Sequence, residues 1–155
     1  MSRTLILPCC LLAAPAFAEN AILTIAQDRY QAGASVRFEG PAVQDLFMAG
    51  DRVVVAAPVA GPAHLAGRRV AIEAAVADDL FAAGCSVVVS GPVGGNATVT
   101  GFEVAIGPVP GNLRAAGSEV SVGDVGGYAL ITVGEATLNG AIHHRRDHRG
   151  AVYRV

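Results

Sequence analysis

The sequence predicts a single all-β domain, a parallel β-helix of about seven coils with sixteen or seventeen residues in each coil. The first observation is a repeat: units such as VADDLFAAGCSVVVSGP, which begins at Val76, recur with this period from Ile25 onward. The period is too short for a pair of helices and suits three short sides per coil. The second observation is a pair of apolar columns that keep the same place in every unit. The third is a composition with 52% hydrophobic but only 5% aromatic residues, which fits thin stacked layers.

The residues that open the coils set the register of the repeat. In chain order they are Ile25, Ala42, Val59, Val76, Val93, Val109 and Val125. The spacing between them is seventeen positions four times and then sixteen positions twice. Ala141 lies sixteen positions further on and would open an eighth coil, whereas the segment before Ile25 is expected to be an irregular N-terminal edge.

Two apolar columns follow eleven and thirteen positions after each opening residue. The first column is Val36, Val53, Val70, Val87, Val104, Val120 and Ala136; the second is Phe38, Val55, Ile72, Val89, Ile106, Val122 and Leu138. Side chains at every second position point to the same side of a strand. Both columns are therefore expected to line the core of the stack.

A glycine lies eight positions after each of the first six opening residues. These predicted corner residues are Gly33, Gly50, Gly67, Gly84, Gly101 and Gly117, and the seventh coil has Val133 there. Glycine at a corner permits either a positive φ or a close approach of neighbouring coils. The sequence leaves both explanations open.

Two more columns precede the glycines. One alternates large and small residues, which lets layers interdigitate: Leu46, Ala63, Leu80, Ala97, Leu113 and Ala129. A second strand of each coil is expected to run through these DLF, NAT and NLR segments. The other column is Asp45, Pro62, Asp79, Asn96, Asn112 and Tyr128. Since Asp and Asn favour turns, we interpret this column as a ladder of turns, with a metal- or sugar-binding ladder as the alternative.

The N-terminal residues 1–18 read as a cleaved export signal. Arg3 is followed by an apolar run and by the A-x-A site that ends at Ala18, so cleavage is expected before Glu19 and the mature chain is expected in the periplasm or outside the cell. A lipoprotein signal is disfavoured because Pro8 precedes Cys9. Removal of the signal leaves Cys85 as the one thiol, which is interpreted as a small side chain beside a corner.

Charge divides the mature chain into a β-helix domain, residues 19–142, and a basic C-terminal cap or tail, residues 143–155. The domain has six arginines against twelve acidic residues, which argues against a nucleic-acid partner. The tail contains His143, His144 and His148 and the arginines Arg145, Arg146 and Arg149. It is interpreted as a solvated tail, with weak metal binding or contact with an anionic envelope surface as alternatives. Val152, Tyr153 and Val155 are candidates to fold back over the last coil.

The repeat resembles that of the bactofilins, bacterial polymer-forming proteins with a right-handed β-helix core. The resemblance lies in units such as DLFMAGDRVVV and GNLRAAGSEVSVGDVGG and extends from about Ile25 to Ala141. It implies head-to-tail assembly of the coil stacks into filaments without a nucleotide, metal or other cofactor. Bactofilins usually act in the cytoplasm, so this chain would be an exported variant.

No catalytic constellation is recognised in the sequence. His64 lies where neighbouring coils have Phe47 and Phe81, and Asp78–Asp79 is the one adjacent carboxylate pair. No coil is enlarged into a loop that could form a cleft. We therefore expect a non-enzymatic scaffold of the bacterial envelope that self-associates through its ends, without a transmembrane span after cleavage. The alternative is a monomeric module that binds cell-wall glycan.

Overall fold

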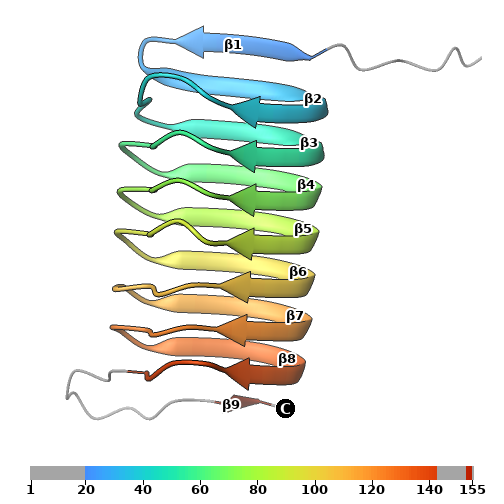
Figure 1. Cartoon of the computed structure of the whole chain (residues 1–155), viewed down its shortest axis with the longest axis vertical. Coiled ribbons are helices and arrows are strands. Elements are labelled where there is room, and N and C mark those ends of the chain that lie inside the picture. The colour runs from blue at the N-terminus through green and yellow to red at the C-terminus, as the bar shows by residue number, and fades with distance from the viewer. Residues whose placement is uncertain (1–19, 143–152, 155) are drawn as a thin grey trace, which may run out of the picture.

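The computed structural model describes residues 20–142 and 153–154, and this part of the chain is a β-solenoid (Figure 1). Nine strands form one sheet in chain order. They are β1 (Ala21–Ile25), β2 (Asp28–Phe38), β3 (Leu46–Val55), β4 (Ala63–Ile72), β5 (Leu80–Val89), β6 (Ala97–Ile106), β7 (Leu113–Val122), β8 (Ala129–Leu138) and β9 (Tyr153–Arg154). The strands β2 to β8 stack in parallel as seven rungs, and the six connections between them complete six turns. The predicted parallel β-helix is thereby confirmed, while its right-handedness stays a prediction.

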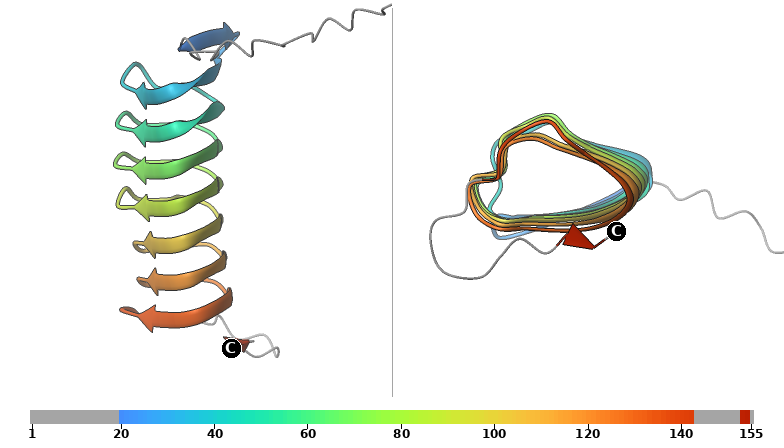
Figure 2. Two further views of the ribbon diagram at one scale, coloured as in Figure 1. Left: turned by 90° about the vertical axis from the view of Figure 1, so that its right-hand side faces the viewer. Right: turned by 90° about the horizontal axis from the view of Figure 1, so that it is seen from below.

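The coils superimpose as a rounded triangle when seen along the stack (Figure 2). Each strand turns a corner and so forms two sides of the triangle (Figure 1, Figure 2), and the strands from β3 to β7 have a glycine near their middle. The predicted second strand is thus the first half of this same strand. The third side contributes isolated bridges between most neighbouring coils, as between Val59 and Val76.

The core of the solenoid consists of the columns that the repeat indicated. The first apolar column is buried from Val36 to Val120, and the second is buried from Phe38 to Val122. The alternating column from Leu46 to Ala129 is also buried, so large side chains lie between small ones along the axis. The last rung is different, because Leu138 is 42% exposed.

The corner glycines are explained by close approach and not by backbone conformation. No glycine of the described residues has a positive φ. A Cβ atom on Gly67 would lie 2.5 Å from the carbonyl oxygen of Gly50 on the preceding rung. The carbonyl oxygen of the preceding rung crowds Gly50, Gly84, Gly101 and Gly117 in the same way, whereas a Cβ atom on Gly33 would meet Asn20.

The N-terminal end departs from the expected pattern. The strand β1 runs antiparallel to β2, and Ile25 pairs with Asp28 across a tight turn in which Ala26 has a φ of 54°. Ile25 therefore ends a hairpin strand and does not open a coil. The first rung, β2, also differs from the others. It has Arg29 and Gln31 at the two positions where β3 has Leu46 and Met48 and where the later rungs are also apolar.

Two opening positions lie one residue later than expected. Val43 pairs with Val59, where Ala42 was predicted, and Ile142 pairs with Val125, where Ala141 was predicted. Val43 and Ile142 both pack against the core. The reason is that the third side has one inward position per coil, and a branched side chain fills it better than alanine does.

Candidate functional site

The Asp and Asn column forms a hydrogen-bonded ladder along the stack. The backbone and side-chain amides of Asn96 donate to Oδ1 of Asp79 at 2.7 and 3.0 Å. Both amides of Asn112 donate in the same way to Oδ1 of Asn96, each at 3.0 Å. The backbone N–H of Tyr128 then donates to Oδ1 of Asn112. These side chains satisfy one another and the turns of successive coils, as the turn-ladder interpretation expected.

A second ladder is aromatic and lies on the outer surface of the first half of the strands. The rings of Tyr30, Phe47, His64 and Phe81 stack with centroids 4.7 to 4.8 Å apart and planes within 5° of parallel. This distance equals the spacing of neighbouring strands. Each inner ring is covered on both faces, so the ladder presents ring edges to the solvent.

An apolar hollow of about 410 Å³ lies beside the first three rings of the aromatic ladder. Its other walls are alanines of the neighbouring column and the hairpin strand β1. On β1, the side chains of Ile22, Leu23 and Ile25 are 55–57% exposed. Among the described residues, the N-terminal end of the stack therefore has an apolar surface, and β1 is the edge strand of the sheet.

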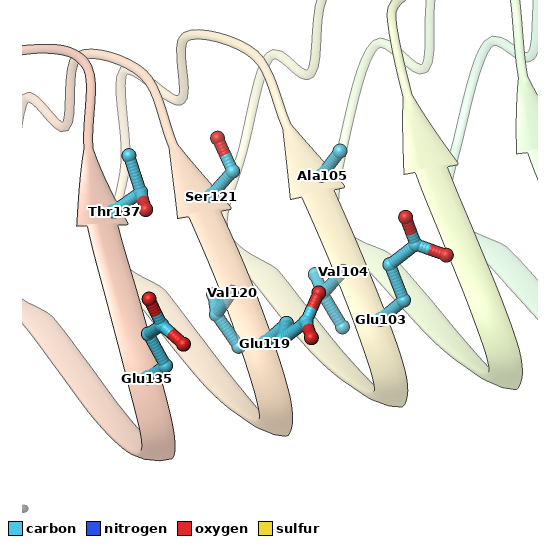
Figure 3. Close-up of a pocket in the computed structure, with 8 residues that line it drawn as sticks. All are labelled: Glu103, Val104, Ala105, Glu119, Val120, Ser121, Glu135 and Thr137. Atoms are coloured by element: carbon cyan, nitrogen blue, oxygen red, sulfur yellow. The ribbon is translucent and has the colours of Figure 1, made fainter.

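The outer surface of the second half of the strands is charged, and its charge changes sign along the stack. In-register residues on the seven rungs form what we name the charge column: Ser35, Arg52, Arg69, Ser86, Glu103, Glu119 and Glu135. All its charged members are exposed. Figure 3 shows the three glutamates side by side on consecutive strands, beside Ala105, Ser121 and Thr137 on the same face. They line a shallow hollow of about 300 Å³.

Other charged side chains on the outer surface pair within the chain. Arg68 donates to both carboxylate oxygens of Asp51, at 2.6 and 2.9 Å. This hydrogen-bonded pair lowers the pKa of Asp51 and raises that of Arg68. Arg37 bonds to Glu39 and Glu73, and its pKa is raised, mainly by the hydrogen bond to Glu39. In the part of the chain that the structure describes, no charged member of the charge column forms such a pair.

The C-terminal end is partly covered. The strand β9 pairs in parallel with Ile131 and Thr132 of β8, as the expected fold-back of Tyr153 implies. Leu130 and Leu138 on the last rung are each 42% exposed. Apolar side chains are thus exposed at both ends of the stack.

Of the residues considered for catalysis, His64 and Asp79 belong to the side-chain ladders, and Cys85 is a free thiol. His64 is a member of the aromatic ladder, and Asp79 accepts the hydrogen bonds of Asn96. Cys85 is an exposed free thiol next to the corner glycine Gly84. Residues 20–142 and 153–154 contain no cluster of three His, Cys, Asp or Glu side chains arranged to hold a metal ion. The same residues include no helix with the length and hydropathy to cross a bilayer.

Two predicted features lie outside the described residues. They are the export signal at residues 1–18 and the charged part of the tail with His143, His144, His148, Arg145, Arg146 and Arg149. The aromatic ladder and the charge column were not predicted, although Tyr30, Phe47, His64 and Phe81 recur at equal intervals of seventeen positions and so gave a visible signal. Compared with known proteins, the chain matches no family model, no curated protein and no solved structure.

Proposed function

We propose that the protein is a non-enzymatic structural component of the bacterial cell envelope whose rods self-associate through their ends, as in the bactofilins that its repeat resembles. The observation that supports this proposal most is the apolar exposure at both ends of the stack. Ile22, Leu23 and Ile25 are exposed on β1, and Leu138 is exposed on the last rung. Exposed strand edges with apolar side chains favour pairing with another chain.

The proposed location is outside the cytoplasm, on the basis of residues 1–18. Cell fractionation combined with N-terminal sequencing of the purified protein tests it. A mature chain that begins at Glu19 in the periplasmic fraction is expected. Intact protein that retains Met1 in the cytoplasm would contradict export and leave the end-to-end assembly open to its own test.

Electron microscopy and sedimentation of the mature protein test the end-to-end assembly. We expect rods that lengthen with concentration, because each end offers an apolar surface to the next rod. The substitution Leu23→Asp should shorten them, whereas Thr24→Asp, on the same exposed strand, adds the same charge without removing an apolar side chain. A mature protein that stays monomeric at high concentration would refute the proposal, as would assembly that is equally sensitive to both substitutions.

The alternative, a module that binds cell-wall glycan, has less support. Its expected contacts were the Asp and Asn column and the arginine tail. The amides and carboxylate of that column bond to one another along the stack, and the stacked rings offer edges instead of the open faces on which a sugar could lie. Retention of the mature protein on purified cell-wall material at low salt would reverse this preference.

A further inference from the structure

The charge column changes sign once, at the middle of the stack. Arg52 and Arg69 lie on β3 and β4, whereas Glu103, Glu119 and Glu135 lie on β6, β7 and β8. The change occurs at β5, the central one of the seven rungs, where the column has Ser86. Like charges directly opposite each other on neighbouring strands are unfavourable. A single rod therefore has two repulsive blocks of opposite sign on one face.

We propose that two copies of this protein pair side by side through this face, with the rod axes antiparallel. The two-fold axis would lie between the paired faces at the level of β5, parallel to the strands and perpendicular to the rod axes. Such an axis places each rung opposite the rung at the same distance on the other side of β5. Arg69 then faces Glu103 of the second copy, and Arg52 faces Glu119. Symmetry repeats both pairs, because a two-fold interface is self-complementary.

The residues next to the charge column fit the same arrangement. Two positions further along each strand, Ala71 would face Ala105, and Val88 at the level of the axis would face its own symmetry mate. Val88 is 40% exposed although it lies on the flat outer face of the central rung. On the corner side, the guanidinium of Arg68 would face the ring of Phe102, which is 65% exposed. The antiparallel arrangement thus brings no like charges together at any of these positions.

A parallel pair does not share this property. A two-fold axis along the rod brings each rung opposite its own copy, so that arginine faces arginine and glutamate faces glutamate. The charge pattern therefore selects the antiparallel orientation through repulsion as well as attraction. The pairing is lateral, so it goes beyond the proposed end-to-end assembly and does not depend on it.

The size of the face indicates a weak and salt-sensitive pair. Six spacings of about 4.8 Å give a stripe about 29 Å long, and only a few side chains span its width. This is well below the area of a standard stable interface, about 800 Å² per partner. Electrostatic attraction then accounts for much of the specificity, and salt screens it.

Charge reversal in two separate variants tests the pairing in solution. The first variant carries Arg52→Glu and Arg69→Glu, and the second carries Glu103→Arg and Glu119→Arg. We expect each variant alone to associate at least about tenfold more weakly than the wild type in sedimentation at low salt. A mixture of the two should form heterodimers, because an acidic face then meets a basic one. Two variants that associate like the wild type, or a mixture that stays monomeric, would overturn the proposal.

Cysteine cross-linking tests the orientation and separates this pair from contacts at the rod ends. In a Cys85→Ser background, Ala71→Cys and Ala105→Cys are made as single variants. The antiparallel pair predicts disulfides in a mixture of the two and few in either one alone, because two copies of position 71 lie two rungs, about 9.6 Å, apart along the axis. Disulfides need Cα atoms within about 7 Å. Efficient cross-linking of each variant with itself would indicate parallel pairing and refute the orientation, and no cross-linking in the mixture would refute the pair.

Discussion

The Asp79–Asn96–Asn112 ladder allows a sharp test of how successive coils are joined. The substitution Asn96→Asp replaces the amide that lies 3.0 Å from Oδ1 of Asp79 with a carboxylate oxygen. A favourable hydrogen bond then becomes a contact between two negative charges. Both residues are half-buried, so solvent screens the repulsion only in part.

The loss in the free energy of unfolding can be bounded from the repulsion between the two carboxylates and from the cost of protonating one of them. Two charges about 4 Å apart repel by about 1 kcal/mol in water and about 4 kcal/mol near a protein surface. The folded chain can instead keep a proton on one carboxyl group, which costs about 4 kcal/mol at pH 7 for a group that ordinarily titrates near pH 4. We therefore expect the free energy of unfolding at pH 7 to fall by about 2–4 kcal/mol relative to the wild type.

Urea unfolding, followed by circular dichroism, measures this loss at several pH values. Protonation of either carboxyl group removes the repulsion in the folded variant, so the loss should shrink as the pH falls from 7 to about 4. The exchange variant Asp79→Asn/Asn96→Asp restores one amide beside one carboxylate and is the matched control. It should recover stability to within about 1 kcal/mol of the wild type. An Asn96→Asp protein as stable as the wild type at pH 7, or a loss that does not depend on pH, would show that the reasoning is wrong.

Three further predictions concern other columns. Gly67→Ala should lower stability by about 1–3 kcal/mol, because its Cβ meets the preceding rung, whereas Gly107→Ala, with 3.4 Å to the nearest atom, should change the urea midpoint little. Leu80→Ala should cost about 2–5 kcal/mol in the same assay, since only alanines lie above and below it in its column. Arg68→Gln should raise the pKa of Asp51 in an NMR titration, because the wild-type ion pair lowers it. The stabilisation from that pair is present above the ordinary pKa of Asp and is lost as the pH falls.

The core of the solenoid was predictable because every rung needs apolar side chains at the same positions. A core that continues through the stack needs an apolar residue at each level, so the period and the columns from Val36 to Val120 are visible in one sequence. The crowding at Gly67 has the same origin, although the repeat alone could not distinguish it from a positive φ.

The ends were not predictable in the same way, because no neighbouring coil constrains them from outside. The hairpin of β1 depends on a turn at Ala26, a residue that rarely has a positive φ and gives no turn signal. The shift from Ala42 to Val43 arises within a loop of unchanged length, where the chain accommodates the residue that best fills the core. Both features depend on local turn and packing geometry, which the period of the repeat does not predict.

The outer columns are informative for the opposite reason: no packing rule forces them to repeat. The aromatic ladder ends at Phe81 on β5, and Thr98 follows on β6. The charge column changes from Arg69 to Glu103 across the same central rung. In these two columns, a uniform core thus supports arginines and stacked rings in the first half of the stack and glutamates in the second. The core alone does not require the change of charge at β5, and the proposed antiparallel copy would match that change by placing Arg69 opposite Glu103 and Arg52 opposite Glu119.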